Sequence, residues 1–200
     1  MSRLRRSPEE SRTLILDAAE AAFARHGFEG TSLADIGAAA GISRGLPAYF
    51  FGSKDRLYTA VVERGRQQIH EVVMSSLRHE SRELEPFLER SIGAFIEYLA
   101  THPNLVRLLQ WEFLHAPGTP RQDAPIALFY ETVGVLHTAL EKAGVGGIDA
   151  VHLLLSIVGM CFFPFIVADP KTMDDQFLAG RKRHIMALLR AGVLPARGRS

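Results

Sequence analysis

The sequence contains one cysteine, Cys161, among its 200 residues. A single cysteine cannot form a disulfide within the chain, so nothing in the sequence requires an oxidising compartment. The basic segment at the front is not followed by an apolar run of secretory length, which argues against a signal peptide. We therefore expect a cytoplasmic protein.

The chain also lacks the short motifs that accompany most catalytic and cofactor sites. It has no phosphate-binding glycine loop, no His-Glu-x-x-His pair, no nucleophile elbow and no cysteine pair at metal-binding spacing. Its eight histidines are scattered, and the nearest pair, His70 and His79, does not share one helical face. We expect a protein that is not an enzyme and that has no cofactor and no metal site.

Long apolar runs are scarce as well. Residues 153–168 are uncharged, but this run is shorter than the roughly 20 residues that span a bilayer, and it contains Pro164. We interpret it as a buried helix and expect no membrane partner. The formal net charge is only +1, which excludes a protein that coats a polyanion but not one that reads DNA through a local basic cluster.

What the chain does contain is helical periodicity. Alternation with a period of two is nearly absent, and apolar residues recur at intervals of three and four almost throughout. Ser7-Pro8-Glu9-Glu10 has the capping serine, early proline and acidic residue of a helix start. The pattern predicts an all-α protein of about nine helices, of which the later five lie near 84–101, 104–115, 124–143, 148–168 and 172–191.

Three helices are predicted near the front, because two short ones follow the helix that begins at Ser7, and a long fourth helix comes after them. One short helix begins at Thr31-Ser32 and closes at Gly41, a second is capped by Ser43, and Ser53 caps the long helix that follows. Two short helices joined by a tight turn with glycine are the geometry of a helix-turn-helix, whose second helix can enter the major groove of DNA.

Residues 12–64 contain a sequence pattern that is much longer than a helix-turn-helix. The segments "ILDAAEAAFARHGFEGTSLADIGAAAGISRG" and "YFFGSKDRLYTAVVE" resemble the N-terminal domain of the TetR (tetracycline-repressor) family. The resemblance implies an N-terminal domain of three helices that binds DNA and a larger C-terminal helical bundle. We place the first domain at residues 1–53, including a basic arm, and the ligand-binding and dimerisation domain at residues 54–200.

The predicted reading helix departs from the common family pattern at Leu46-Pro47-Ala48, where Thr-Leu-Tyr is usual. Proline has no N–H to donate and its ring crowds the preceding turn, so we expect Pro47 to tighten or shift the start of this helix. Ala48 is small, and we expect it to let the backbone approach the groove.

The resemblance implies DNA contacts from the start of the second helix, from the reading segment and from the start of the fourth helix. Helix N-termini and lysine suit phosphate oxygens, whereas arginine can bind guanine with two hydrogen bonds. Phe50 has two open interpretations, packing inside the domain or contact with a thymine methyl group. The candidate DNA-binding residues are Thr31, Ser32, Arg44, Gly45, Ala48, Tyr49, Phe50 and Lys54.

The C-terminal body offers many more apolar side chains than a DNA-reading domain needs. Most of them form a core, and some aromatic ones are candidates for lining a cavity for an apolar or aromatic effector, as the resemblance also implies. Glu112 and His137 interrupt apolar faces. Each either orients a ligand or has its polar atoms satisfied without one, Glu112 by solvent at the helix edge and His137 by hydrogen bonds within the core. The candidate ligand-binding residues are Phe95, Trp111, Glu112, Phe113, Phe129, Tyr130, His137 and Phe163.

The last two predicted helices, 148–168 and 172–191, carry apolar surface that one chain does not need. Pairing them with a second copy makes a homodimer with two reading helices for a pseudo-palindromic operator. We expect a transcriptional repressor that a small-molecule effector releases from double-stranded DNA. The alternatives are a DNA-binding regulator whose C-terminal domain binds a protein or no ligand and, less favoured, a helical carrier or enzyme.

Overall fold

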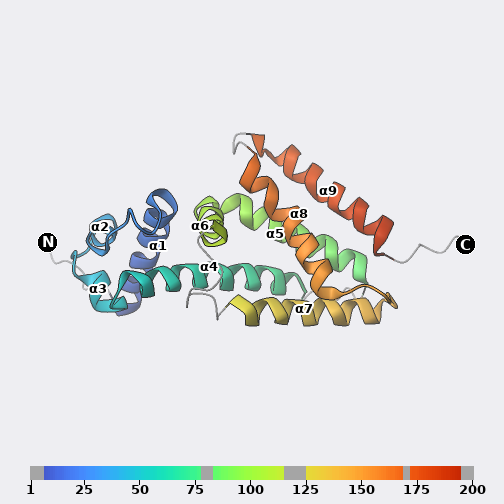
Figure 1. Ribbon diagram of the computed structural model, residues 1–200, viewed down its shortest axis with the longest axis horizontal. Coiled ribbons are helices and arrows are strands. Elements are labelled where there is room, and N and C mark those ends of the chain that lie inside the picture. The colour runs from blue at the N-terminus through green and yellow to red at the C-terminus, as the bar shows by residue number, and fades with distance from the viewer. Residues whose placement is uncertain (1–6, 78–82, 115–124, 169–171, 195–200) are drawn as a thin grey trace, which may run out of the picture. The chain divides into compact units, whose positions relative to one another are not determined.

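The computed structural model describes residues 7–77, 83–114, 125–168 and 172–194, and for residues 76–77, 113–114 and 125–126 only the backbone. Within these ranges the chain forms nine helices and no strand (Figure 1). The predicted all-α fold is confirmed. The helices are α1 (Pro8–His26), α2 (Leu33–Ala39), α3 (Leu46–Phe51), α4 (Lys54–Leu77), α5 (Leu84–Thr101), α6 (Pro103–Leu114), α7 (Pro125–Lys142), α8 (Ala150–Val167) and α9 (Asp175–Gly192).

The chain forms two compact units. The first takes the described parts of residues 1–66 and 103–122, and the second takes those of residues 67–102 and 123–200. The first unit therefore contains α6 and the first half of α4 in addition to α1, α2 and α3. The functional division into residues 1–53 and 54–200 stays a prediction.

Local capping explains where most of the N-terminal helices begin. Ser7 and Glu10 form the predicted capping box, in which the Ser7 hydroxyl accepts from the Glu10 N–H at 3.1 Å and Glu10 accepts from the Ser7 N–H at 2.7 Å. Ser32 caps α2 by accepting from the Asp35 N–H, and the Ser53 hydroxyl accepts from the Arg56 N–H at 3.2 Å. These three helix starts were predicted correctly.

The prediction that Ser43 caps α3 was wrong, because α3 begins three residues later with Gly45 as its N-cap residue. A helix that started at Ser43 would need the N–H of residue 47 as a donor to the Ser43 carbonyl, and Pro47 has none. The Ser43 carbonyl instead accepts from the Leu46 N–H at 3.0 Å, which closes a tighter turn. The predicted shift of the helix start by Pro47 is thus confirmed.

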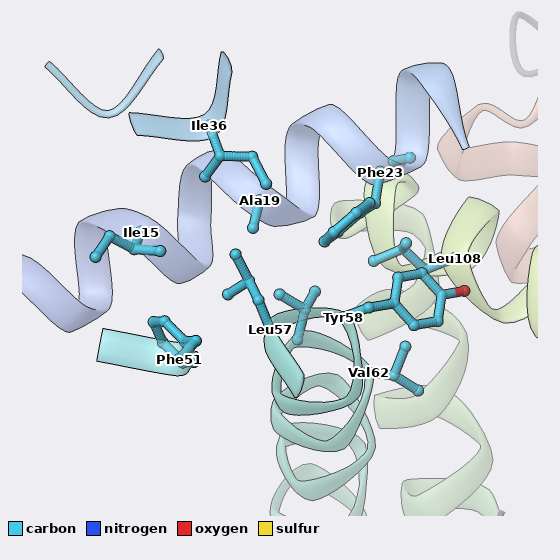
Figure 2. Close-up of a cluster of buried hydrophobic side chains, with 11 residues drawn as sticks. Ile15, Ala19, Phe23, Ile36, Phe51, Leu57, Tyr58, Val62 and Leu108 are labelled. Carbon is cyan, nitrogen blue, oxygen red and sulfur yellow. The ribbon is translucent and has the colours of Figure 1, made fainter. Parts of the chain in front are cut away.

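The core of the first unit lies where α1, α2 and α4 converge (Figure 2). Phe23 packs edge to face against Tyr58, with ring centroids 5.0 Å apart, and Leu57 is fully buried. Leu108 of α6 enters the same cluster, which explains why α6 belongs to this unit. Burying each such large apolar side chain stabilises the fold by roughly 1.5–3 kcal/mol.

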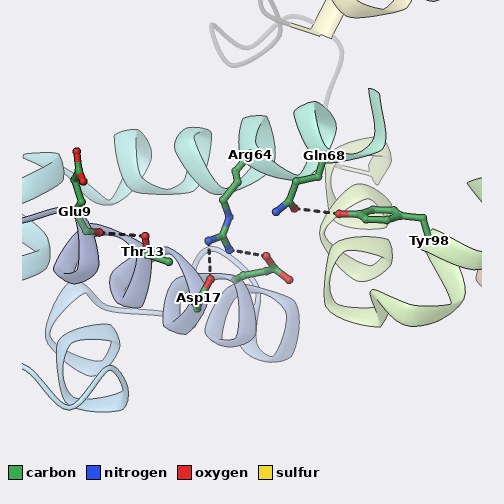
Figure 3. A network of polar contacts seen from close by, with 7 residues as sticks. Glu9, Thr13, Asp17, Arg64, Gln68 and Tyr98 are labelled. Atoms are coloured by element: carbon green, nitrogen blue, oxygen red, sulfur yellow. Dashed lines mark hydrogen bonds and ion pairs between the residues drawn. The ribbon is translucent and has the colours of Figure 1, made fainter. Parts of the chain in front are cut away.

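The long helix α4 contributes to both units. In the first unit its Arg64 binds Asp17 and Glu20 of α1, at 2.6 Å and 2.8 Å (Figure 3). In the second unit Gln68 accepts a hydrogen bond from the Tyr98 hydroxyl of α5 at 3.0 Å (Figure 3). One continuous helix therefore provides structural contacts to two separately packed bodies.

The second unit is built around α5 and α8, which pack against each other and against α9 and α7. Arg181 of α9 donates two hydrogen bonds to the Met160 carbonyl of α8, at 2.9 Å and 2.7 Å. Cys161 is fully buried between these helices, and burial raises the pKa of its thiol to about 12. The cysteine therefore stays protonated and unreactive at neutral pH.

α8 differs from the prediction of a buried helix. It is the one described helix that is long and apolar enough to cross a membrane, with a mean hydropathy of 2.3, yet only 33% of its residues are buried. Leu153, Ile157 and Cys161 face the core, while the opposite face is open. The open face consists of His152, Leu155, Ser156, Gly159, Phe163, Ile166 and Val167.

Candidate nucleic-acid interface

The turn between α2 and α3 is held by a close backbone approach. A Cβ atom on Gly37 of α2 would lie 2.9 Å from the Arg44 Cα and the Ser43 carbonyl oxygen, and 3.2 Å from Pro47 Cδ. These are mostly backbone atoms that cannot move aside, so only glycine lets the two helices pack this tightly. Gly41 turns the chain between them with a φ of 65°.

α3 has one inward and one outward face. Pro47 and Phe51 are buried, and Phe50 is half-buried against the core of the first unit. Arg44, Gly45, Ala48 and Tyr49 are exposed, and Tyr49 is 83% exposed. Such exposure of a tyrosine on a six-residue helix indicates a surface suited to a partner, because Tyr49 adds little to the core.

The Tyr49 ring still has a defined neighbour, because it packs edge to face on Phe50 with centroids 5.4 Å apart. Of the two interpretations left open for Phe50, packing within the domain agrees with its contacts. Its half-buried ring nevertheless borders the exposed face that Ala48 and Tyr49 form.

Thr31 and Ser32, at the start of α2, lie in different environments. Thr31 is 4% exposed, and its hydroxyl donates to the carbonyls of Gly27, at 2.8 Å, and Ala22, at 3.3 Å. Ser32 is exposed and its hydroxyl is engaged with Asp35. Thr31 thus fixes the end of α1 against α2, and Ser32 presents the helix terminus to solvent.

The ammonium group of Lys54 already has interaction partners within the protein. Its ammonium donates to the Phe28 carbonyl at 3.0 Å and lies 4.3 Å from the centroid of the Phe28 ring. An ammonium has three donors, so this single hydrogen bond leaves others for a second acceptor.

The predicted ligand-binding residues do not gather in one place. Trp111 and Glu112 belong to the first unit, where the Trp111 ring lies against Gly27 and Glu112 forms an ion pair with Arg66 at 3.6 Å. The side chain of Phe113 lies outside the described residues. The remaining five predicted residues belong to the second unit.

Within the second unit these five residues have different surroundings. Phe95 is in the core, whereas Tyr130 and Phe163 are each 58% exposed. Phe129 packs edge to face on Tyr130, with centroids 5.6 Å apart. His137 is exposed and lies 3.3 Å from Glu141, one turn later on the same helix.

Two polar residues of α4 were not identified from the sequence. Arg66 is half-buried, and burial lowers the pKa of its guanidinium, an effect that the nearby Glu112 carboxylate partly offsets. His70 has its Nε2 atom 3.4 Å from Glu131, while its Nδ1 atom is buried without a hydrogen-bond partner in the described part of the chain. Their spacing on an amphipathic helix was the available signal, but it does not reveal burial.

Metal binding receives no support from the described side chains, because no three histidine, cysteine, aspartate or glutamate residues among them come together.

The two halves of the chain each match a family of known proteins. The family model described as "Bacterial regulatory proteins, tetR family" matches residues 15–61, and the model "Tetracyclin repressor-like, C-terminal domain" matches residues 86–188. The chain belongs to the TetR family.

Other members of the TetR family resemble this regulator over most of their length. The HTH-type transcriptional repressor NicS of Pseudomonas putida is 29% identical over 161 residues, which are 78% of this chain and 76% of NicS. The HTH-type transcriptional repressor SCO4008 of Streptomyces coelicolor is 28% identical over 170 residues, 83% of this chain and 84% of its own. This TetR-family protein is therefore a DNA-binding transcriptional regulator and not an enzyme.

The fold of this TetR-family regulator also matches solved structures. The transcriptional regulator FadR of Bacillus subtilis, in complex with stearoyl-CoA, superposes with a TM-score of 0.74 at 19% identity. The match covers 90% of this chain and 98% of FadR. At this identity the likeness concerns the fold.

Proposed function

We propose that this TetR-family regulator is a cytoplasmic, dimeric repressor that binds a pseudo-palindromic operator through α3. A small, largely apolar or aromatic effector in the C-terminal helices releases it. The observation that carries the proposal is the exposed surface formed by Ala48 and Tyr49 of α3 and by Arg44 in the turn before it, while Pro47 and Phe51 anchor the helix from within.

The exposed residues of α3 and of the turn before it suit different parts of DNA. The Arg44 guanidinium can donate two hydrogen bonds to the O6 and N7 atoms of one guanine. The Tyr49 hydroxyl suits a phosphate oxygen, and Gly45 and Ala48 leave room for the groove wall. Arg44 thus supports sequence specificity, and Tyr49 supports register on the duplex.

The start of α2 and Lys54 complete this proposed interface. Ser32 and the N-terminal N–H groups of α2 suit a phosphate, because a helix N-terminus favours negative charge. Thr31, buried and hydrogen-bonded, holds that terminus in place. Lys54 binds a phosphate with the donors that the Phe28 carbonyl leaves free.

The dimer is proposed to form through α8 and α9. The open apolar face of α8 runs along the whole helix, and α9 exposes Phe177 and Leu188. Small residues, Ser156 and Gly159, lie in the middle of the α8 face and would let a second helix approach closely. A twofold pairing of both helices makes a four-helix interface and presents two reading helices to two half-sites.

The effector site is proposed to lie in the second unit. FadR, which shares the fold, was solved with an acyl-CoA ligand. In this chain the buried Nδ1 atom of His70 carries a cost that a hydrogen-bonding group of an effector would remove. The aromatic residues Phe95, Phe129 and Tyr130 of the same unit are the candidates for holding the rest of such a ligand.

The signal is proposed to pass along α4 and α6. α4 contributes to both units, so a tilt of its second half also moves its first half, which packs on α1. α6 holds Leu108 in the core of the first unit and Glu112 against Arg66. A coupling of about 1–3 kcal/mol between effector and operator is typical of such regulators.

The decisive experiment selects bound duplexes from a random pool with the full chain, measures their affinity, and then screens compounds for release. We expect a pseudo-palindrome and at least one releasing compound. Failure to bind any duplex at low salt would disprove the proposed operator binding. A selected operator that no compound releases would disprove only the proposed response to an effector.

His70→Leu tests the effector site once a releasing compound is known. The substitution removes a buried unpartnered nitrogen, so we expect the empty protein to unfold at a higher temperature while the compound loses its effect. Glu131→Gln is the matched variant, because it changes the exposed partner of His70 and leaves the imidazole in place. Full release from the His70→Leu protein would exclude this residue.

A further inference from the structure

The sequence suggests that Arg12 extends the basic N-terminal arm formed by Arg3, Arg5 and Arg6, which lie outside the described residues. The structure places Arg12 in α1 instead, exposed on the helix surface. Its guanidinium carbon lies 4.5 Å from the centroid of the Phe51 ring. Phe51 is the last residue of α3 and is only 6% exposed, so the ring is a fixed platform.

Figure 2 shows how the ring is held. Phe51 lies beside Ile15 of α1, one turn after Arg12, and both side chains belong to the buried cluster of the first unit. A platform packed in this way cannot rotate away, so the guanidinium that lies over it keeps a defined position.

A second arginine lies at the same end of α3. A Cβ atom on Gly52, the residue after Phe51, would lie 3.6 Å from Nη1 and 3.9 Å from Cδ of Arg56. Arg56 is exposed in the first turn of α4. Two guanidinium groups, from α1 and from α4, therefore stand beside Phe51 and Gly52.

Neither guanidinium forms an ion pair within the described part of the chain. Arg64 of the same unit, by contrast, binds two carboxylates, and Arg190 of the second unit binds Glu85 at 2.6 Å. The charges of Arg12 and Arg56 are thus available to an external anion.

Stacking on a ring leaves the donors of a guanidinium free. All five N–H groups lie in the guanidinium plane, so a ring below that plane attracts the charge without using a donor. An arginine held this way loses less freedom when it binds a planar pair of oxygen atoms, and phosphate is a preferred partner.

We infer that Arg12 and Arg56 form a phosphate clamp that grips the DNA backbone at the C-terminal end of α3, with Phe51 as the residue that positions Arg12. The inference rests on DNA binding by this TetR-family regulator. The competing explanation is that both cations only balance the partial negative charge at the end of α3, which would affect folding and not DNA.

The test measures DNA affinity against salt concentration for Arg12→Ala, Arg56→Ala and the double variant. A selected operator and an unrelated duplex are measured in parallel. Each lost phosphate contact should lower the slope of log affinity against log salt by about 0.9, which is about eightfold in affinity at 0.1 M salt, and each substitution removes one such contact from each protomer of the dimer. Affinity should fall equally for both duplexes, because binding to phosphates carries no sequence information.

Arg25→Ala is the matched control. Arg25 is exposed on the same helix but lies about 20 Å further along its axis, so its removal changes the net charge equally and should leave the salt slope unchanged.

Two further variants test the platform. Arg12→Lys keeps the charge but loses the planar fork, and Phe51→Leu keeps an apolar side chain but removes the ring face. Both should keep the wild-type salt slope and weaken DNA binding several-fold. If Phe51→Leu lowers the unfolding temperature, Arg12→Lys still decides, because Arg12 is outside the core.

The alternatives give distinct results. An unchanged slope in the folded double variant, or a change in unfolding temperature alone, would overturn the clamp. If the variants bind only the selected operator more weakly, the arginines contact bases and not phosphates, which would also overturn the clamp. A wild-type chain that binds no duplex would instead refute the proposed operator binding, and the clamp with it.

Discussion

α3 and α8 expose surfaces of opposite chemistry. α3 is a six-residue helix that presents Tyr49 and, from the turn before it, Arg44, whereas α8 is an 18-residue helix that presents a stripe of apolar side chains. Neither surface contributes to the core of the chain. The first suits a polar, anionic partner, and the second suits another apolar surface.

The difference shows how one chain can specify two kinds of partner. An exposed apolar stripe gains stability by excluding water, so its partner needs shape more than charge. An exposed tyrosine and arginine gain little from excluding water, so their partner needs acceptors at defined positions. Of the predictions below, the first two each break one of these surfaces, and the third tests the helix starts beside the surface of α3.

Gly159→Arg should have the largest effect. Nothing lies within 4 Å of a Cβ at this position, so the single chain accepts the side chain, but the charge lies in the middle of the α8 stripe. We expect a monomer by sedimentation and an operator affinity that is about 100-fold weaker or more, because one of two half-sites is released.

Gly134→Arg is the control for that substitution. Gly134 is exposed on α7 and also has nothing within 4 Å of its Cβ position. It should leave both the oligomeric state and the operator affinity unchanged. A dimeric Gly159→Arg protein with wild-type affinity would contradict the assignment of α8 to the interface.

Arg44→Ala should have the next largest effect, on the surface of α3. Removing a bidentate pair of hydrogen bonds to guanine costs about 1–3 kcal/mol of discrimination, so the selected operator should bind roughly 5- to 150-fold more weakly. Arg44→Lys keeps the charge and should retain binding to unrelated DNA while losing preference for the operator. Retained discrimination in both variants would exclude Arg44 from base reading.

Ser32→Ala and Ser43→Ala form a pair with a smaller expected difference. Ser32 caps α2, so its removal should cost about 1 kcal/mol of the free energy of unfolding. Ser43 does not cap α3, so its removal should leave stability nearly unchanged. Denaturant titration of both variants measures the difference, and equal destabilisation would contradict the helix start at Leu46.

The sequence predicted the features that depend on local chemistry. Helix starts at Ser7, Ser32 and Ser53 follow from a hydroxyl and an N–H three residues apart, and α5 spans the predicted residues 84–101. The same local rule failed at Ser43. A serine can cap a helix, but a helix that started at Ser43 would also need the N–H that Pro47 lacks.

The features that depend on packing partners could not be predicted. Leu108 lies on an apolar helical stripe, but periodicity does not reveal that this stripe packs into the core of the first unit. The position of Arg12 over Phe51 joins residues 39 positions apart, and no spacing rule connects them. Trp111 shows the same limit, since its neighbour Gly27 lies just after the end of α1.

The buried thiol of Cys161 has a practical consequence for spectroscopy. Because this cysteine is shielded and protonated, a labelling reagent at neutral pH finds no natural target in the folded chain. Arg25→Cys would then place one spin label on each copy of α1. The distance between the two labels would report directly how far the two DNA-binding domains of the dimer move apart when an inducing compound binds.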